Sequence, residues 1–138
     1  MSEIGRAIFT ILSGDATLNT ALGASTSATG QKKIYPNIAP QNETAPYIVY
    51  QRSTTQPDWC KEGMPIVTHY FTVAAFAPNP DTLNTICARI LTLLNNQGGT
   101  YGSTVVSGMK YNNDQDEIYE LEPVLFAREL EFEIRETR

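Results

Sequence analysis

The residue types that most often carry out chemistry are sparse in this chain. His69 is the single histidine, and the two cysteines, Cys60 and Cys87, lie far apart. One imidazole and two distant thiols cannot form an ordinary four-ligand zinc site. As a general base, His69 would need a nucleophile or a carboxylate beside it, and no motif supplies one. We therefore expect His69 to be a partly buried or interface residue, and both cysteines to be free thiols.

Two further segments superficially resemble ligand-binding loops. The acidic run 113–117 offers oxygen ligands, but it lacks the central glycine and the bidentate glutamate of a calcium loop. The glycines at 98, 99 and 102 end a predicted helix, and no Lys-Ser/Thr pair follows them, so they do not form a phosphate loop. The sequence therefore predicts no catalytic residue, no metal and no cofactor.

Composition narrows the class of protein further. The 138 residues are 41% hydrophobic, which is enough for one core, and we expect a single domain over residues 1–138. The net charge is -5 and the basic residues are scattered, which argues against a nucleic-acid-binding surface. No apolar run approaches the roughly 20 residues that span a bilayer. The N-terminus lacks the basic segment of a secretory signal, so we expect use in a cytoplasm-like compartment without membrane contact.

Helical periodicity appears at two places. Apolar residues recur at helical spacing over 2–13, with Ser2 as a cap and Gly14 as the end, and Asp15 then caps a second short helix. Asn79 caps a longer helix that begins at Pro80 and ends in the polar and glycine residues 95–99.

Strand patterns occupy much of the remaining chain. A short extended piece over 34–36 is followed by strands over 47–52 and 67–77, the second of them central and apolar on both faces. Residues 53–66 are predicted to be a long connection. A strand bulged at Gly108 is predicted to follow the second long helix.

The polar residues 112–117 are predicted to form a turn before the last strand. In that strand Phe126, Leu130, Phe132 and Ile134 share one face, while the other face carries charged residues. The order of elements indicates an α+β fold. We expect an antiparallel or mixed sheet that the N-terminal helix and the second long helix cover on one face.

The remaining candidates are contact residues. Trp59 lies in the predicted 53–66 loop, where it either anchors an interface or folds back over an edge of the core. The charged face of the last strand is an ordinary solvated face, although in a ring it could line an acidic lumen that does not hold DNA. The predicted interface residues are Asp58, Trp59, Lys61, Glu62, Glu129, Glu131 and Glu133.

Five segments, in this order, carry a resemblance to a known family. They are IFTILSGDATLNTALG, IYPNIAPQ, PYIVYQR, YFTVAAFAPNPDTLNTICARILTLLN and LFARELEFEI. Together they resemble the tail-completion family of long-tailed phages and prophages, which is related in fold to the lambdoid tail terminators. The Ser/Thr-rich residues 24–29 and the Trp-bearing residues 53–66 depart from the family pattern, and they leave the subunit contacts open.

The resemblance implies a structural virion protein without catalysis or cofactor. Such a subunit forms a homohexameric ring in the neck, at the head-proximal end of the tail tube. The ring stops tube polymerisation and joins the tail to the head connector proteins, with genomic DNA only passing through its lumen. Assembly would take place in the bacterial host cytoplasm.

Two alternatives remain open at this point. The first is another phage head-completion or minor tail component, which ring stoichiometry and position in the particle would distinguish. The second is a small ligand-binding or enzymatic α+β domain that uses His69, Tyr70 and Asp58. A closed pocket around His69 would favour the second alternative.

Overall fold

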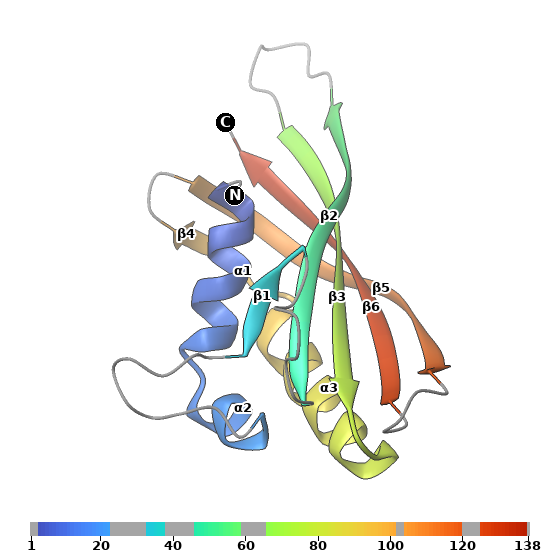
Figure 1. Cartoon of the computed structure of the whole chain (residues 1–138). Coiled ribbons are helices and arrows are strands. Elements are labelled where there is room, and N and C mark those ends of the chain that lie inside the picture. The colour runs from blue at the N-terminus through green and yellow to red at the C-terminus, as the bar shows by residue number, and fades with distance from the viewer. Residues whose placement is uncertain are drawn as a thin grey trace.

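Three helices and six strands make up the part of the chain that the computed structural model describes, residues 3–22, 33–37, 46–58, 66–101, 104–119 and 125–137 (Figure 1). The helices are α1 (Glu3–Ser13), α2 (Ala16–Ala21) and α3 (Pro80–Leu94). The strands are β1 (Ile34–Pro36), β2 (Tyr47–Asp58), β3 (Ile66–Ala77), β4 (Gly99–Tyr101), β5 (Thr104–Tyr119) and β6 (Leu125–Thr137).

The strands form one mixed sheet in the order β1-β2-β3-β6-β5-β4. Only β1 and β2 are parallel, and every other neighbouring pair is antiparallel. β3 and β6 are the two central strands, so β3 holds the central place that its apolar sequence predicts. The expected α+β class is confirmed.

Helices α1 and α3 lie against one face of this sheet (Figure 1). The inward-facing residues of β3 alternate with outward-facing ones, and Phe71 and Val73 on the inner row of side chains are buried beneath the helices. On β6, the inner row at Leu130, Phe132 and Ile134 is likewise buried. The second face of β3, although its sequence is also largely apolar, is not covered by a described helix, because both long helices lie on the same side.

The helix boundaries follow the local capping signals. Asp15 caps α2 by accepting a hydrogen bond from Leu18 N at 2.8 Å, and Asn79 caps α3 by accepting one from Thr82 N at 2.8 Å. Asn96 follows α3 with a φ of 63°, a left-handed conformation that asparagine tolerates at helix ends. The predicted cap Ser2 lies outside the described residues.

Two polar segments are strands, contrary to the sequence-based prediction. β2 continues through residues 53–58, which pair with β3 after a bulge between Arg52 and Thr54. Residues 112–117 are not a turn, because they continue β5 and pair with β6. In both cases one neighbouring strand satisfies the backbone N–H and C=O groups on its side, and solvent-exposed polar side chains do not oppose that pairing.

The predicted irregularity near Gly108 is a bulge. The β5–β6 register shifts between Val106 and Gly108, which leaves Ser107 as the extra residue, and shifts again between Tyr111 and Asn113. The short strand β4, which the sequence did not predict, pairs with β5 before the first bulge.

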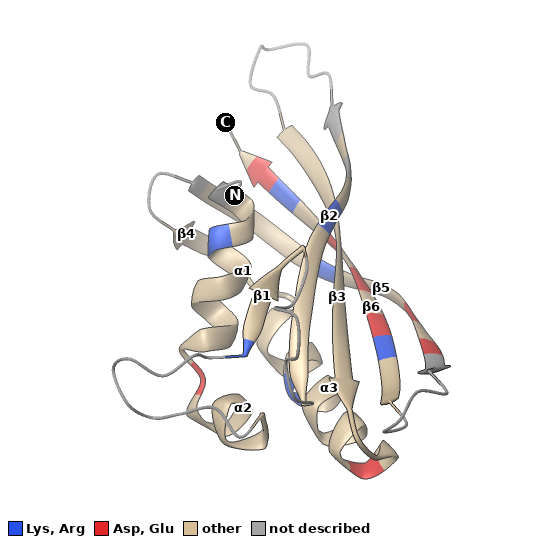
Figure 2. Ribbon diagram, viewed as in Figure 1, with Lys and Arg blue, Asp and Glu red and all other residues tan. Residues whose placement is uncertain are grey.

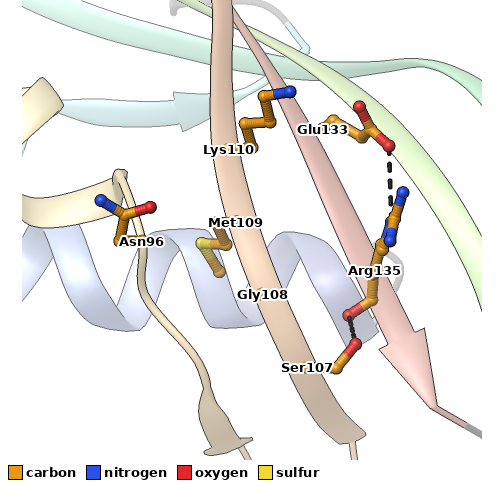
Figure 3. A pocket seen from close by; sticks show the side chains of 7 residues that line it. All are labelled: Asn96, Ser107, Gly108, Met109, Lys110, Glu133 and Arg135. Carbon is orange, nitrogen blue, oxygen red and sulfur yellow. Dashed lines mark hydrogen bonds and ion pairs between the residues drawn. The ribbon is translucent and has the colours of Figure 1, made fainter.

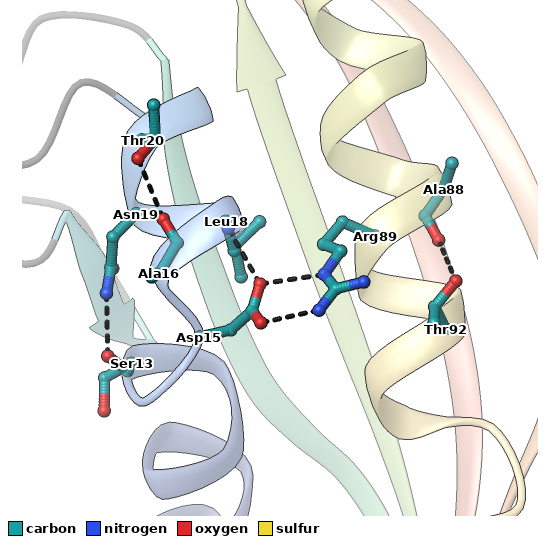
Figure 4. Close-up of polar contacts among 9 residues, drawn as sticks. All are labelled: Ser13, Asp15, Ala16, Leu18, Asn19, Thr20, Ala88, Arg89 and Thr92. Atoms are coloured by element: carbon teal, nitrogen blue, oxygen red, sulfur yellow. Dashed lines mark hydrogen bonds and ion pairs between the residues drawn. The ribbon is translucent and has the colours of Figure 1, made fainter.

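A half-buried polar contact joins α2 to α3 (Figure 4). Arg89 donates from Nε and Nη2 to the two carboxylate oxygens of Asp15, at 2.8 and 2.7 Å. The hydrogen bond from Arg89 lowers the pKa of Asp15 most strongly, partial burial opposes that shift, and the Leu18 amide reinforces it. The same carboxylate therefore caps one helix and holds it against another.

We predict that Asp15→Ala lowers the free energy of unfolding by about 1–3 kcal/mol, because it removes both the cap and the partner of Arg89. Asp15→Asn keeps an acceptor for the cap but loses the charge and one of the two hydrogen bonds from Arg89, so its effect is smaller. The folded-state pKa of Asp15 is depressed, so the stabilisation is present above its unfolded-state pKa and is lost as the pH falls through the folded-state value. Urea unfolding should therefore show the gap between wild type and Asp15→Asn closing at pH values below 3.8. A gap that stays constant with pH would contradict this account.

Candidate assembly surfaces

The face of the sheet opposite the helices carries a row of charges from β6 (Figure 2). Glu129, Glu131 and Glu133 are half-buried on this face and Arg135 is exposed, and they alternate with the buried inner residues of the same strand. Arg135 lies 3.5 Å from Glu133 between Nε and Oε1. The described helices leave this face uncovered. We call it the open face.

Of the other predicted interface residues, only Asp58 belongs to a described strand. Asp58 is the last residue of β2 and pairs with Ile66, the first residue of β3. Trp59, Lys61 and Glu62 lie outside the described residues, so their interface role stays a prediction.

The first bulge of β5 produces a hollow on the open face (Figure 3). Gly108 has no side chain there, and a Cβ added to it would meet nothing within 4 Å. The hollow measures about 580 Å³ and is lined by Asn96, Ser107, Gly108, Met109, Lys110, Glu133 and Arg135. Two cations and one carboxylate surround it, a mixture that suits a polar protein surface better than a single charged cofactor.

Two exposed apolar residues lie on the same face, beyond the hollow. Ile66 and Val105 are 38% and 44% exposed, and both pair with Thr137 from opposite sides. They form a short apolar row across β3, β6 and β5. Such a row next to a polar hollow is a feature of surfaces that contact other proteins.

His69 is only 2% exposed and belongs to a polar cluster on the inner face. Its Nδ1 lies 3.1 Å from Thr55 Oγ1 on β2, and its Nε2 lies 3.1 Å from Glu136 Oε1 on β6. Glu136 is also buried. The sequence-based prediction did not identify Glu136 as a partner of His69. Glu136 is two residues from Ile134, and the period-two alternation of a strand places both on the inner face.

A hydroxyl, an imidazole and a carboxylate in line are the elements of an activated nucleophile. Here His69 is enclosed by the protein. It lines neither the hollow at Gly108 nor a second hollow between α1, β1 and β2. The alternative site of His69, Tyr70 and Asp58 is not brought together, because adjacent strand residues point to opposite faces and Tyr70 lies on the open face. The cluster therefore joins β2, β3 and β6 within the fold.

Cys87 is a core residue of α3. Burial raises the pKa of its thiol to about 11, so the thiol stays protonated and is a poor nucleophile. Cys60 lies outside the described residues. Within the described ranges, no group of three or more His, Cys, Asp or Glu side chains could hold a metal ion. None of the helices in those ranges is long and apolar enough to cross a membrane.

These features define a class of protein. The sheet is covered on one side and presents charges, a polar hollow and exposed apolar residues on the other, which is the build of a subunit that works through contacts with other proteins. The family model of the tail completion protein gp17 matches residues 6–137, and the chain belongs to this family. It is therefore a structural tail component of a virion, which confirms the family inferred from the sequence.

A solved structure shares the fold. A chain from the structure described as the virion of a native gene transfer agent particle is 15% identical and has a TM-score of 0.74. The match covers 96% of this chain and 94% of that chain. The comparison with curated proteins finds no match.

We predict that His69→Phe destabilises the protein by about 1–3 kcal/mol, because it removes the hydrogen-bond partner of Oε1 of the buried Glu136 carboxylate. The double variant His69→Phe/Glu136→Leu should recover much of that loss. Urea unfolding of the two single variants and the double variant forms a double-mutant cycle. Additive losses would show that the two side chains do not depend on each other.

Proposed function

We propose that this protein closes the head-proximal end of a tail tube as a hexameric ring. The ring stops tube polymerisation and offers a docking face to the head connector proteins. The observation that carries the proposal is membership of the tail-completion family over residues 6–137. In this proposal the whole chain, residues 1–138, acts as one tail-completion domain, and assembly takes place in the bacterial host cytoplasm.

The shape of the sheet supports ring closure. Subunits that associate head to tail close into a ring when the rotation between neighbours divides the circle, and each subunit then needs two different contact surfaces. The two lateral edges of this sheet differ, since β1 and β2 form one edge and β4 and β5 form the other.

The open face is the proposed wall of the lumen. Glu129, Glu131 and Glu133 carry the same charge as the DNA backbone, so a lumen lined by them repels passing DNA instead of holding it. This gives the acidic row a role that the solvated face of a monomer would not need.

The contacts along the ring axis, with the tail tube on one side and the head connector on the other, are proposed to come from chain segments between the helices and strands. Two segments, residues 23–33 and 53–66 as bounded from the sequence, are candidates for this role. Because 53–58 belong to β2, a deletion that starts at residue 54 would remove paired strand as well as loop. The second of these two segments is therefore shortened to residues 59–65, which contain Trp59, Lys61 and Glu62.

Light scattering of the purified protein, alone and with tail-tube protein, tests the ring. We expect a hexamer mass in at least one of the two conditions. A monomer in both conditions would contradict the ring and would favour another head-completion or minor tail component.

We predict that Glu131→Lys makes the assembled ring bind duplex DNA, because each subunit then exchanges a lumen carboxylate for a cation on the same face as Lys110 and Arg135. Binding should fall steeply with added salt. Asp81→Lys, which makes the same charge change at an exposed position of helix α3, is the matched control and should leave DNA binding unchanged. Co-sedimentation of DNA with the ring is the measurement, and equal binding by both variants would place Glu131 outside the lumen.

A further inference from the structure

Both lateral edges of the sheet have a stretch that no described strand covers. β1 pairs with β2 only at residues 48–50, and Asn37 N donates to Tyr50 O. Beyond that point, residues 51–58 of β2 have β3 as their only neighbour among the described strands. We call this stretch the β2 free edge.

The opposite edge has a matching stretch. β4 pairs with β5 only at residues 104–106, and the chain after α3 bonds to β5 at Met109 and Tyr111. Residues 112–119 then have β6 as their only neighbour within the described part of the chain. We call them the β5 free edge. An uncovered strand edge presents backbone donors and acceptors to another chain.

Strand direction allows the two free edges to meet. β2, β3, β6 and β5 alternate in direction, so β5 runs antiparallel to β2. A second copy placed head to tail therefore brings β5 beside β2 as an antiparallel pair. The β2 free edge lies at the upper end of the sheet and the β5 free edge at the lower end (Figure 1). Pairing these two edges displaces each copy along the strand direction relative to its neighbour. Strands that close around an axis show the same kind of displacement.

Charge distinguishes the two edges (Figure 2). The β5 free edge contains Asp114, Asp116 and Glu117, with Arg128 bonded to Asp116. The side of the sheet formed by β1 and the start of the β2 free edge carries Lys33 and Arg52, and Asp58 is at the far end of β2.

The opposite charges lie on the same face of the sheet. Arg52 pairs with the buried Phe71, and Asp114 pairs with the buried Leu130, so both charged residues belong to the helix-covered side. In a sheet continued from copy to copy, Arg52 of one subunit and Asp114 of the next would lie on one face.

A hollow beside the β2 free edge lies where a neighbour would dock. It measures about 310 Å³ and lies between α1, the end of β1 and β2, where Gly5, Asn37, Gln51 and Arg52 contribute to its lining. A side chain from an incoming strand would fit this space.

The same features affect the pairing of like edges. Two β5 free edges would bring acidic residues together, which destabilises the pair. On the β2 free edge, Pro57 lacks an N–H and the bulge at Ser53 interrupts the ladder. The acidic residues disfavour β5–β5 dimers, whereas Pro57 and the bulge shorten the pairing of any strand with β2, so it is charge that favours the β5–β2 contact.

We propose that the β5 free edge of one copy pairs antiparallel with the β2 free edge of the next, with Asp114 facing Arg52. This inference rests on the proposed ring, for which it names the subunit interface.

Cross-linking between two variants tests the contact directly. In a Cys60→Ser background, one variant carries Gln51→Cys and the other Gln115→Cys, both at exposed positions on the open-face side. A short bis-maleimide linker is added in the condition that gives the ring mass. We expect covalent dimers only when the two variants are mixed, and a ladder when one chain carries both cysteines. Dimers of Gln115→Cys alone would overturn the proposal in favour of two-fold pairing.

Charge reversal gives an independent readout. Arg52→Glu and Asp114→Arg should each weaken self-association at least about tenfold, because each brings like charges together at the interface. The double variant restores the opposite charges and should recover assembly. Asp81→Arg makes the same charge change as Asp114→Arg at an exposed position of α3 and should leave assembly unchanged. Double variants no better than the single ones would overturn the Asp114–Arg52 contact.

The ring and its interface fail in different ways. A hexamer mass without cross-links in the mixture overturns this interface and leaves the ring standing. A monomer mass both alone and with tail-tube protein overturns the ring, and this interface with it.

Discussion

The structure depends on burying one face of the two central strands. On β3 and β6, most of the inward-facing residues are apolar and lie beneath the helices, where Phe71, Val73, Leu130 and Phe132 form the middle of the core. Burial of such side chains contributes about 1.5–3 kcal/mol each, so these rows favour a single register. A shift of one residue would expose the apolar row and bury Glu131 and Glu133.

Once that register is set, the position of the polar groups follows. Thr55, His69 and Glu136 come from three strands and meet on the inner face, where each can satisfy part of the hydrogen bonding of the next. Asp15 and Arg89 do the same between two helices. Polar groups withdrawn from water destabilise the folded state unless they are hydrogen-bonded. Both contacts therefore restrict how the helices and strands can be arranged.

The uncovered half of the sheet is where the function is proposed to lie. An open face with an acidic row, an apolar row at Ile66 and Val105, and a hollow at Gly108 gives the protein several surfaces for other proteins. A tail-completion subunit has to contact its neighbours, the tube and the connector, and one sheet face with two unlike edges offers surfaces for separate contacts. The covered face supplies the stability on which those contacts depend.

The sequence by itself determined the helices and the central strands, because capping side chains, glycines and period-two or helical spacing act within a few residues of the chain. Asp15, Asn79 and the alternating residues of β6 were readable for that reason. Only the tertiary structure decided that the polar residues 53–58 and 112–117 are strands, since backbone pairing with β3 and β6 stabilises them independently of side-chain pattern. His69 and Glu136 are likewise far apart in the chain, and only the register of the sheet brings them within hydrogen-bond distance.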